Sequence, residues 1–403
     1  MSLIARPSSP LHGTAFVPGD KSISHRALML AALAKDESRI TGLLEGADVL
    51  ATAAALRAMD VKIERDADDC WCVRPPTDGL TEPANVLDMG NAGTAARLLA
   101  GVIAGHAMTA ILTGDASLRS RPMVRIADPL TQMGAHFLAR SGTRLPMAIR
   151  GADPVLPIRY ETPVASAQVK SAILLAGLKA TGETVVTEKA ATRDHTERML
   201  AEFGASIRTK TGTDGRPVVT LTGPANLTGR EIVVPRDISS AAFLLVAALI
   251  VPNSQIVLPG VGVNPGRIGL VLSLREMGAD IVLSNEHDSC GEPVADLTVR
   301  ASRLTGIDVP SARVPSMIDE IPILAVAAAC ATGTTRLTGL AELKHKESDR
   351  LTVMAEGLAA CGVHVTAGAD TLKINGTGEP PPGGAVVDTC HDHRIAMSFL
   401  VLG

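Results

Sequence analysis

The chain has 403 residues, of which 46% are hydrophobic and 20% charged, and its net charge is −4; this composition is typical of a globular protein with more than one domain. Only 2% of the residues are aromatic, and without stacking platforms or a broad basic surface we expect no nucleic-acid partner. The apolar runs are shorter than the roughly 20 residues that cross a bilayer, and residues 1–10 carry no apolar signal core, so we expect no membrane association and a cytoplasmic location.

One plan recurs six times along the chain, at a spacing of roughly 75 residues. In each copy a short strand-like run leads into a cluster of small, polar or charged residues, and an apolar helical run follows. The clusters occupy, in chain order, residues 19–22, 90–94, 165–168, 237–240, 316–319 and 391–394. We expect each cluster to form a helix N-terminus, where unpaired backbone N–H groups and a partial positive charge favour phosphate or carboxylate.

A second half follows each of the first five clusters: a β-rich run, a charged loop and an amphipathic helix. In four copies a glycine comes directly after this helix, at the position where a left-handed residue closes it; these are Gly134, Gly204, Gly278 and Gly362. The chain stops at Gly403, about where the sixth second half is expected. We therefore expect an incomplete sixth unit, and a chain that is less stable and less active than an extended one.

Strand and helix alternate throughout, so the predicted fold class is mixed α and β. The natural division is three copies plus three. Pro18 and Pro235 stand at its candidate hinges, because each lies just before a helix start that opens a set of three copies.

The first two clusters carry side chains suited to anions. Lys21 stands at the expected start of a helix, and Ser22 and Arg26 are four residues apart on one helix face. Asn91 and Gly93 combine an amide with a glycine that lets a ligand approach the backbone. Each set also has a simpler interpretation: a solvated helix cap in the first cluster, and a cap with close helix packing in the second.

The loops of the second halves carry arginine at matching places in four of five copies: Arg121, Arg193, Arg267 and Arg350. The planar guanidinium group pairs bidentately with carboxylate or phosphate, as lysine cannot. This repetition exceeds what a random charged surface predicts, and it indicates anion binding.

Two acids stand among these cations. Asp319 precedes an apolar helical run, and Glu347 lies next to Lys346 and three residues before Arg350. The structural alternatives are a helix N-cap for Asp319 and an ion-pair partner for Glu347. Together in a cation-rich site, the two carboxylates are candidates for proton transfer, which is typically worth about 10²- to 10⁴-fold in rate. His393, at the last helix start, is more often a structural group than a catalyst.

No GxGxxG motif, Walker loop, nucleophilic-serine elbow or metal-ligand pattern is present. The cysteines form no CxxC pair and are interpreted as reduced thiols, neither disulfides nor zinc ligands; they are Cys70, Cys72, Cys290, Cys330, Cys361 and Cys390. We therefore expect no metal and no organic cofactor, and a chemistry in which side chains act on anionic substrates.

Six motifs, in order over nearly the whole chain, resemble those of the 5-enolpyruvylshikimate-3-phosphate synthase family. The motifs are Gly19–Arg26, Gly90–Thr94, Arg121–Met123, Ser166–Gln168, Lys346–Arg350 and Asp392–Arg394. The resemblance implies an α/β (mixed α+β) fold of two domains, the enolpyruvyl transferase fold, with three βαβαββ repeats in each domain and the sixth repeat incomplete here. It places residues 19–234 in one domain, residues 1–18 with 235–403 in the other, and the active site in the interdomain cleft.

The family reaction transfers the enolpyruvyl group of phosphoenolpyruvate to the 5-hydroxyl of shikimate 3-phosphate and releases phosphate, in the shikimate pathway to chorismate and the aromatic amino acids. By resemblance, shikimate 3-phosphate is bound by Lys21, Ser22, Arg26, Ser166, Ala167, Gln168, Arg193, Asp319 and Lys346. Phosphoenolpyruvate is surrounded by Lys21, Asn91, Gly93, Arg121, Gln168, Glu347, Arg350 and Arg394. The implied catalytic residues are Lys21, Asp319 and Glu347: Asp319 takes the 5-hydroxyl proton, and the other two assist proton transfer at the enol carbon.

Ala167 and Lys170 look like those of a bacterial subgroup of this family that includes glyphosate-tolerant members. Those members carry alanine where this chain has Gly93. A methyl group there would crowd the inhibitor glyphosate, so we expect this chain to be more sensitive to glyphosate than those members are. Nothing in the sequence demands a partner chain, and we expect a monomer.

Two other functions compete with this hypothesis. The sister enzyme that moves enolpyruvyl to UDP-N-acetylglucosamine shares the six-unit fold, but it lacks the lysine- and arginine-containing motifs at 21–26 and 346–350 and usually has a cysteine in the loop that corresponds to residues 117–121 here. A non-catalytic repeat protein that binds small anions would leave no reason for Asp319 and Glu347 to lie among cations.

Overall fold

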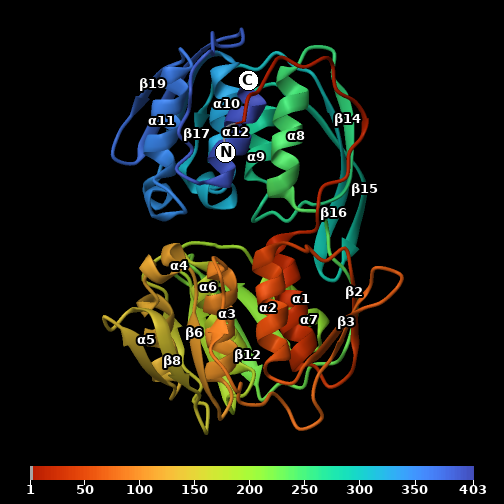
Figure 1. Cartoon of the computed structure of the whole chain (residues 1–403), viewed down its shortest axis with the longest axis vertical. Helices are drawn as coiled ribbons and strands as arrows, with labels where there is room; N and C mark the ends of the chain where they lie inside the picture. Colours follow the sequence, from red (N-terminus) through yellow and green to blue (C-terminus); the bar gives the residue numbers. More distant parts are fainter. Residues whose placement is uncertain (1–2) are drawn as a thin grey trace. The chain divides into compact units, whose positions relative to one another are not determined.

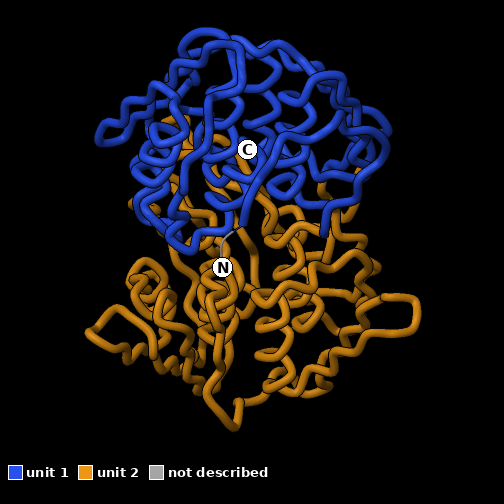
Figure 2. The backbone as a smooth tube through the Cα atoms, turned by 45° about the horizontal axis from the view of Figure 1, so that its top comes forward, with its two compact units in different colours: residues 1–18, 236–287, 293–403 blue, residues 19–235, 288–292 orange. Residues whose placement is uncertain are grey.

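The computed structural model describes residues 3–403, which form two compact units (Figure 1). Of the described residues, unit 1 contains 3–18, 236–287 and 293–403, and unit 2 contains 19–235 and 288–292 (Figure 2). The units differ from the expected domains in two places. Pro235 belongs to unit 2, where its carbonyl accepts the N–H of Asp20 at 2.8 Å, and so does the short segment 288–292. None of the described helices is long and apolar enough to span a membrane.

The first three repeats lie in unit 2. Repeat one comprises α1 (Lys21–Leu33), β2 (Ser38–Thr41), α2 (Ala47–Arg57), β3 (Lys62–Arg65) and β4 (Trp71–Arg74). Repeat two comprises β5 (Leu87–Asp88), α3 (Gly93–Ala104), β6 (Thr109–Thr113), the short α4 (Ala116–Ser120), α5 (Val124–Gln132), β7 (His136–Arg140) and β8 (Arg144–Arg150). Repeat three comprises β9 (Arg159–Glu161), α6 (Ala167–Gly177), β10 (Gly182–Thr187), α7 (His195–Glu202), β11 (Ser206–Thr211) and β12 (Pro217–Gly223), and β13 (Glu231–Val233) follows it.

The later repeats lie in unit 1, which also holds β1 (His12–Thr14). Repeat four comprises α8 (Ile238–Ile250), β14 (Gln255–Gly262), α9 (Gly269–Glu276), β15 (Asp280–Ser289) and β16 (Glu292–Arg300). Repeat five comprises β17 (Asp308–Val309), α10 (Ile321–Ala329), β18 (Thr332–Thr338), α11 (Arg350–Ala360), β19 (His364–Ala367) and β20 (Thr371–Thr377), with 3-10 turns at Ser311–Ser316 and Ala341–His345. The sixth helix start opens α12 (His393–Leu402).

Residues 3–403 contain five four-stranded sheets, and all five have the same topology. In repeat two, β5 pairs with β6 in parallel, β6 with β8 antiparallel, and β8 with β7 antiparallel. Repeats three and five keep all four strands in the same way. The βαβαββ plan expected from the sequence is therefore the observed unit, and the fold class is confirmed.

Repeats one and four exchange their first strands. β1 precedes α1 in sequence but pairs in parallel with β14, with His12 opposite Gln255. β13 precedes α8 but pairs in parallel with β2, with Glu231 opposite Arg39. Each unit thus completes a sheet with a strand that is distant in sequence: β1 comes from the N-terminal segment of unit 1, and β13 from the end of the segment 19–235. This is why the chain passes between the units at residues 18–19 and 235–236.

The first helices of the repeats form the core of each unit. In unit 2, α3 packs against α1 and α6, and in unit 1, α8, α10 and α12 pack against one another (Figure 1). Small residues permit this close packing: a Cβ added to Gly101 of α3 would lie 2.7 Å from Cα of Ala172 on α6. Every residue of α10 is buried, so this helix shows no amphipathic pattern.

Five of the six predicted clusters contain the first residue of a helix, namely Lys21, Gly93, Ala167, Ile238 and His393. The cluster at 316–319 ends two residues before α10, which begins at Ile321. The glycines after four second-half helices have φ values of +86° to +103°, a backbone region that costs residues with a Cβ but not glycine. Asp319 is not the N-cap of α10, because Glu320 occupies that position.

Candidate active site

The first helix start in unit 2 is held by Asp20, whose Oδ1 accepts the N–H of Ile23 at 2.9 Å. This cap places Lys21 at the first helical position, where its half-exposed ammonium lies 3.1 Å from Oδ2 of Asp48. Burial, followed by the charge of Lys21, lowers the pKa of His25 to about 3. The motif histidine is therefore neutral, and it packs inside the unit instead of presenting a titrating group.

Arg26 is a buried cation with every nitrogen engaged. Nε donates to Oγ1 of Thr196 at 2.7 Å, Nη2 to Oγ of Ser171 at 2.8 Å, and Nη1 to the carbonyl of Ser22 at 2.9 Å. Burial lowers its pKa to about 10, so it stays protonated at neutral pH. The partners come from α1, α6 and α7, and Arg26 therefore links these three helices.

Arg121, the C-cap residue of α4, lies beside the second helix start, where its Nη2 donates to Oδ1 of Asn91 at 2.9 Å and to Oγ of Ser117 at 3.1 Å. Asn91 in turn donates through Nδ2 to Oδ2 of Asp115 at 2.7 Å. This chain of contacts holds an arginine fork beside the N-terminus of α3, a combination that suits a carboxylate or phosphate.

Gln168 links the second and third helix starts. Its Oε1 accepts from Nη1 of Arg97 at 3.0 Å, and its Nε2 donates to Oγ1 of Thr94 at 3.0 Å. A Cβ on Gly93 would lie 3.0 Å from Nη1 of Arg97 and 3.2 Å from Nη1 of Arg121. Gly93 therefore leaves room for two guanidinium groups next to the helix end.

The third helix start is capped by Ser166, whose Oγ accepts the N–H of Val169 at 3.4 Å, and α6 then begins at Ala167. Further along this helix Lys170 is buried and pairs with Glu188 at 2.8 Å and Glu197 at 2.6 Å. Burial raises the pKa of Glu197 despite the lysine. These two carboxylates flank the loop that carries Arg193 toward α7.

The cluster in unit 1 centres on Arg350, whose side chain is only 1% exposed. Its Nε lies 2.8 Å from Oδ2 of Asp392, its Nη2 lies 2.6 Å from Oε2 of Glu347, and its Nη1 lies 3.4 Å from Oδ1 of Asp319. Lys346 reaches the same Oδ1 of Asp319 at 3.0 Å. One buried guanidinium thus orders three carboxylates from three separate segments of the chain.

Arg394 completes this cluster from the start of α12, where Nη1 donates to the carbonyl of Asp319 at 3.2 Å and lies 3.6 Å from Oε1 of Glu320. Burial by itself would raise the pKa of Glu347, but the charge of Arg350 and a backbone hydrogen bond together outweigh burial, and this pKa lies below its ordinary value. Burial would also raise the pKa of Asp392, but the hydrogen bond from Arg350, its charge and a backbone hydrogen bond together lower that pKa. Ionised acids and cations therefore coexist at neutral pH.

The structure brings the predicted residues together in two groups, one in each unit. Unit 1 unites Asp319, Lys346, Glu347, Arg350 and Arg394 in one set of contacts. In unit 2, one set of contacts joins Asn91, Gly93, Arg121 and Gln168, a second joins Ser22 and Arg26, and the charge of Arg193 acts on Arg26. Lys21 joins neither set and pairs with Asp48.

Sequence reasoning missed three members of these groups. Arg97 lies four residues after Gly93, as Arg26 does after Ser22, so aligning the helix starts could have found it. Asp392 belongs to the Asp392–Arg394 motif, but no local sequence pattern predicts its contact with Arg350. Glu320 binds Oγ of Ser239 and lies 3.7 Å from Arg267; only the folded chain shows this.

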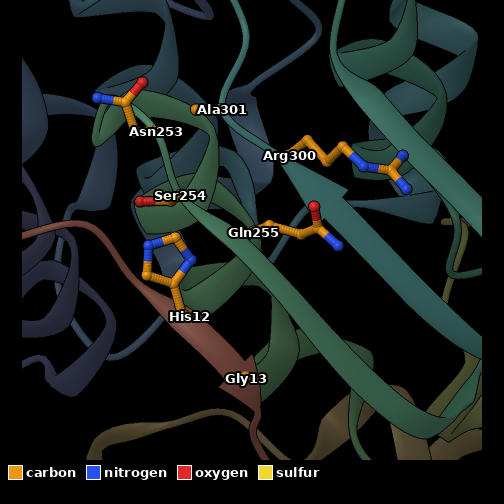
Figure 3. Close-up of a pocket in the computed structure, with 7 residues that line it drawn as sticks. All are labelled: His12, Gly13, Asn253, Ser254, Gln255, Arg300 and Ala301. Atoms are coloured by element: carbon orange, nitrogen blue, oxygen red, sulfur yellow. The ribbon is translucent and has the colours of Figure 1, made fainter.

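Two other features of the described residues carry no predicted site residue. A surface hollow of about 500 Å³ lies where β1, β14 and β16 meet (Figure 3); its arginine, Arg300, already pairs with Asp280 at 3.2 Å and points away from His12. Asp66, Cys70 and Cys72 have donor atoms close enough for a metal ion. Arg39 occupies that place, because its Nη2 lies 2.8 Å from Asp66.

The arrangement can bind several phosphate or carboxylate groups and can move protons. Helix N-termini and arginine forks supply the anion sites, and carboxylates held among cations supply groups that can accept a proton.

Two units of βαβαββ repeats with such helix starts define the enolpyruvyl transferase class of fold. A solved member, the enolpyruvyl transferase NikO from Streptomyces tendae, is 16% identical to this chain, with a TM-score of 0.75 over 99% of this chain and 89% of its own; this likeness shows the fold alone.

The particular family follows from closer matches. A family model described as EPSP synthase (3-phosphoshikimate 1-carboxyvinyltransferase) matches residues 5–403. Proteins named 3-phosphoshikimate 1-carboxyvinyltransferase from Rhodospirillum rubrum and Paramagnetospirillum magneticum are 61% and 60% identical, each over 100% of this chain and 90% of its own length. The EPSP synthase structure from Acinetobacter baumannii is 46% identical, with a TM-score of 0.88 over 99% of this chain and 91% of its own. The chain belongs to the EPSP synthase family.

Proposed function

We propose that this protein transfers the enolpyruvyl group of phosphoenolpyruvate to the 5-hydroxyl of shikimate 3-phosphate and releases phosphate. The observation that carries the proposal is the unit 1 cluster, in which Asp319 and Glu347 both contact one buried arginine and lie with Lys346. A protein that only binds anions gains nothing from carboxylates among its cations, whereas an enzyme that moves protons on anionic substrates needs both.

The reaction assigns distinct tasks to these groups. The 5-oxygen bonds to the central carbon of the enolpyruvyl group, the bond from that carbon to the phosphate oxygen breaks, and the hydroxyl proton is lost. Asp319 takes that proton, while Lys21 and Glu347 add and then remove a proton at the methylene carbon. Lys346 lies 3.0 Å from Asp319, which keeps a cation beside the base and orients it.

Both groups of residues contribute to the binding of each substrate. Shikimate 3-phosphate is held by Lys21, Ser22, Arg26, Ser166, Ala167, Gln168, Arg193, Asp319 and Lys346. Phosphoenolpyruvate is held by Lys21, Asn91, Gly93, Arg121, Gln168, Glu347, Arg350 and Arg394. Each substrate carries a phosphate and a carboxylate, and this number of anionic groups explains why cations recur at the helix starts. The monomeric state, the cytoplasmic location and the placing of the active site between the domains stay predictions.

Phosphate release tests the proposal against its two rivals. The protein is mixed with phosphoenolpyruvate and shikimate 3-phosphate, with phosphoenolpyruvate and UDP-N-acetylglucosamine, and with phosphoenolpyruvate alone. We expect release in the first mixture only. Release in the second mixture supports the sister activity instead, and release in none of them, from folded protein, leaves the anion-binding repeat protein.

Gly93→Ala is expected to raise the glyphosate concentration for half-inhibition by about 10- to 100-fold. The new methyl group would lie 3.0 Å from Arg97 and 3.2 Å from Arg121, and overpacking of this kind costs about 1–3 kcal/mol. The guanidinium groups must move, and an inhibitor that fills the space beside them is excluded. Inhibition curves at fixed phosphoenolpyruvate concentration measure the effect.

Gly46→Ala is the matched control, because its Cβ would meet only Leu44, at an ordinary contact distance of 3.6 Å. This variant should keep the inhibition curve of the wild type. A Gly93→Ala curve that coincides with the control counts against the placing of the inhibitor beside Gly93.

A further inference from the structure

A five-residue segment of the β15–β16 hairpin lies in a different unit from the rest of that hairpin. Residues 280–287 and 293–300 belong to unit 1, whereas residues 288–292 belong to unit 2. The chain therefore passes between the units twice more than the exchange of β1 and β13 requires. A short segment that only turned a hairpin would have no need of buried charge, and this one has it.

Helix α7 and strand β13 hold the segment in unit 2. Arg198 donates from Nη1 to the carbonyl of Gly291 at 2.9 Å, and Ser289 donates from Oγ to the carbonyl of Val233 at 2.8 Å. The third anchor is the pair of His195 and Glu292, whose Nδ1 and Oε1 are 2.7 Å apart. Both side chains of this pair are 2% exposed.

The chemistry of the pair determines which ring nitrogen of His195 carries the hydrogen. A carboxylate only accepts hydrogen bonds, so Nδ1 of His195 carries the proton that it donates to Glu292. Nε2 of the same ring is buried and has no hydrogen-bond partner. The polar contact that orients the His195 ring therefore comes from Glu292, a residue 97 positions away in sequence.

The His195 ring stands at the first position of α7, among residues of the proposed shikimate 3-phosphate site. Arg193 precedes it by two residues, and Thr196, the next residue, receives the Nε–H of Arg26 at 2.7 Å. The negative charge of Glu292 also acts on Arg26, where it opposes the effect of burial on the arginine. Movement of Glu292 would thus be felt at both arginines.

We infer that Glu292 is a positioning residue of the shikimate 3-phosphate site: through His195 it fixes the start of α7, and so the places of Arg193 and Arg26. The inference rests on the proposed function. It also explains why a hairpin of unit 1 delivers a buried carboxylate to unit 2. Glu292 touches no substrate in this role, so its removal should weaken shikimate 3-phosphate binding and leave the reacting groups intact.

Glu292→Gln tests the inference, because glutamine keeps the shape and an acceptor oxygen but removes the charge. We expect KM for shikimate 3-phosphate, and its dissociation constant by calorimetry, to rise about tenfold, the range of a lost buried charge-assisted contact. We expect kcat and KM for phosphoenolpyruvate to change less than twofold. Asp288→Asn, in the same segment but exposed, is the matched control and should match the wild type in every constant.

If Glu292→Gln does not fold, a second pair of variants serves. His195→Ala removes the donor and should raise KM for shikimate 3-phosphate, whereas His195→Asn keeps an N–H near the place of Nδ1 and should restore most of the binding. Wild-type binding by Glu292→Gln, or kcat and both KM values that change together, overturns the inference. A wild-type protein that binds shikimate 3-phosphate but releases no phosphate overturns the proposed function instead.

Discussion

We expect asparagine in place of Asp319 to lower kcat by about 10²- to 10⁴-fold, the range of a lost general base. The amide has nearly the size of the carboxylate and keeps an oxygen for Lys346, which lies 3.0 Å from Asp319. It does not accept the hydroxyl proton, so the new carbon–oxygen bond forms from a neutral hydroxyl. Phosphate release at saturating concentrations of both substrates measures the change in kcat.

The matched control for this variant is Asp308→Asn. Asp308 lies in the same unit and pairs with Arg336 at 2.8 Å, but its side chain is 71% exposed. Its replacement should leave kcat unchanged. If Asp319→Asn keeps kcat within twofold of the wild type while the control does the same, Asp319 does not act as the base, and Glu347 becomes the acid to test.

We expect Arg350→Met to lower the free energy of unfolding of unit 1 by about 3–5 kcal/mol, because a buried cation is lost and its carboxylates stay. Asp392 is 0% exposed and Asp319 is 15% exposed, so water does not replace the guanidinium group. Methionine fills a similar volume, and the loss therefore reports charge more than packing. Urea denaturation of the wild type and the variant gives the difference.

Arg336→Met is the matched control, since the pair of Arg336 with Asp308 is exposed and such pairs contribute about 0–1 kcal/mol.

The pH dependence of the free energy of unfolding gives a second test of the Arg350 cluster. The folded-state pKa values of Glu347 and Asp392 are below their ordinary values, so their contribution is present above the unfolded-state pKa and is lost as the pH falls through the folded-state pKa. The difference in free energy of unfolding between the wild type and Arg350→Met should shrink in that pH window. A difference that is already small at neutral pH contradicts the stabilising role of Arg350.

The repeat plan and the helix starts could be predicted because local interactions set them. Asp20 and Ser166 bond to backbone N–H groups three residues ahead, and Gly134 closes a helix by its own backbone conformation. A cap or a closing glycine depends on residues within one helical turn. The periodic pattern therefore located Lys21, Gly93 and the other starts without any knowledge of the fold.

The sequence by itself determined the six-copy plan, the mixed α and β class, the helix starts and the family whose motifs those starts carry. The tertiary structure decided the exchange of β1 and β13, the contact of Arg350 with Asp392 across 42 residues, and the contact of Arg26 with Thr196 across 170. It also removed Asp319 from the cap position and placed Glu292 beside His195. The physical reason is that a cap is satisfied within its own turn, whereas a buried charge must find its partner wherever the folded chain brings one, since leaving it unpaired costs several kcal/mol.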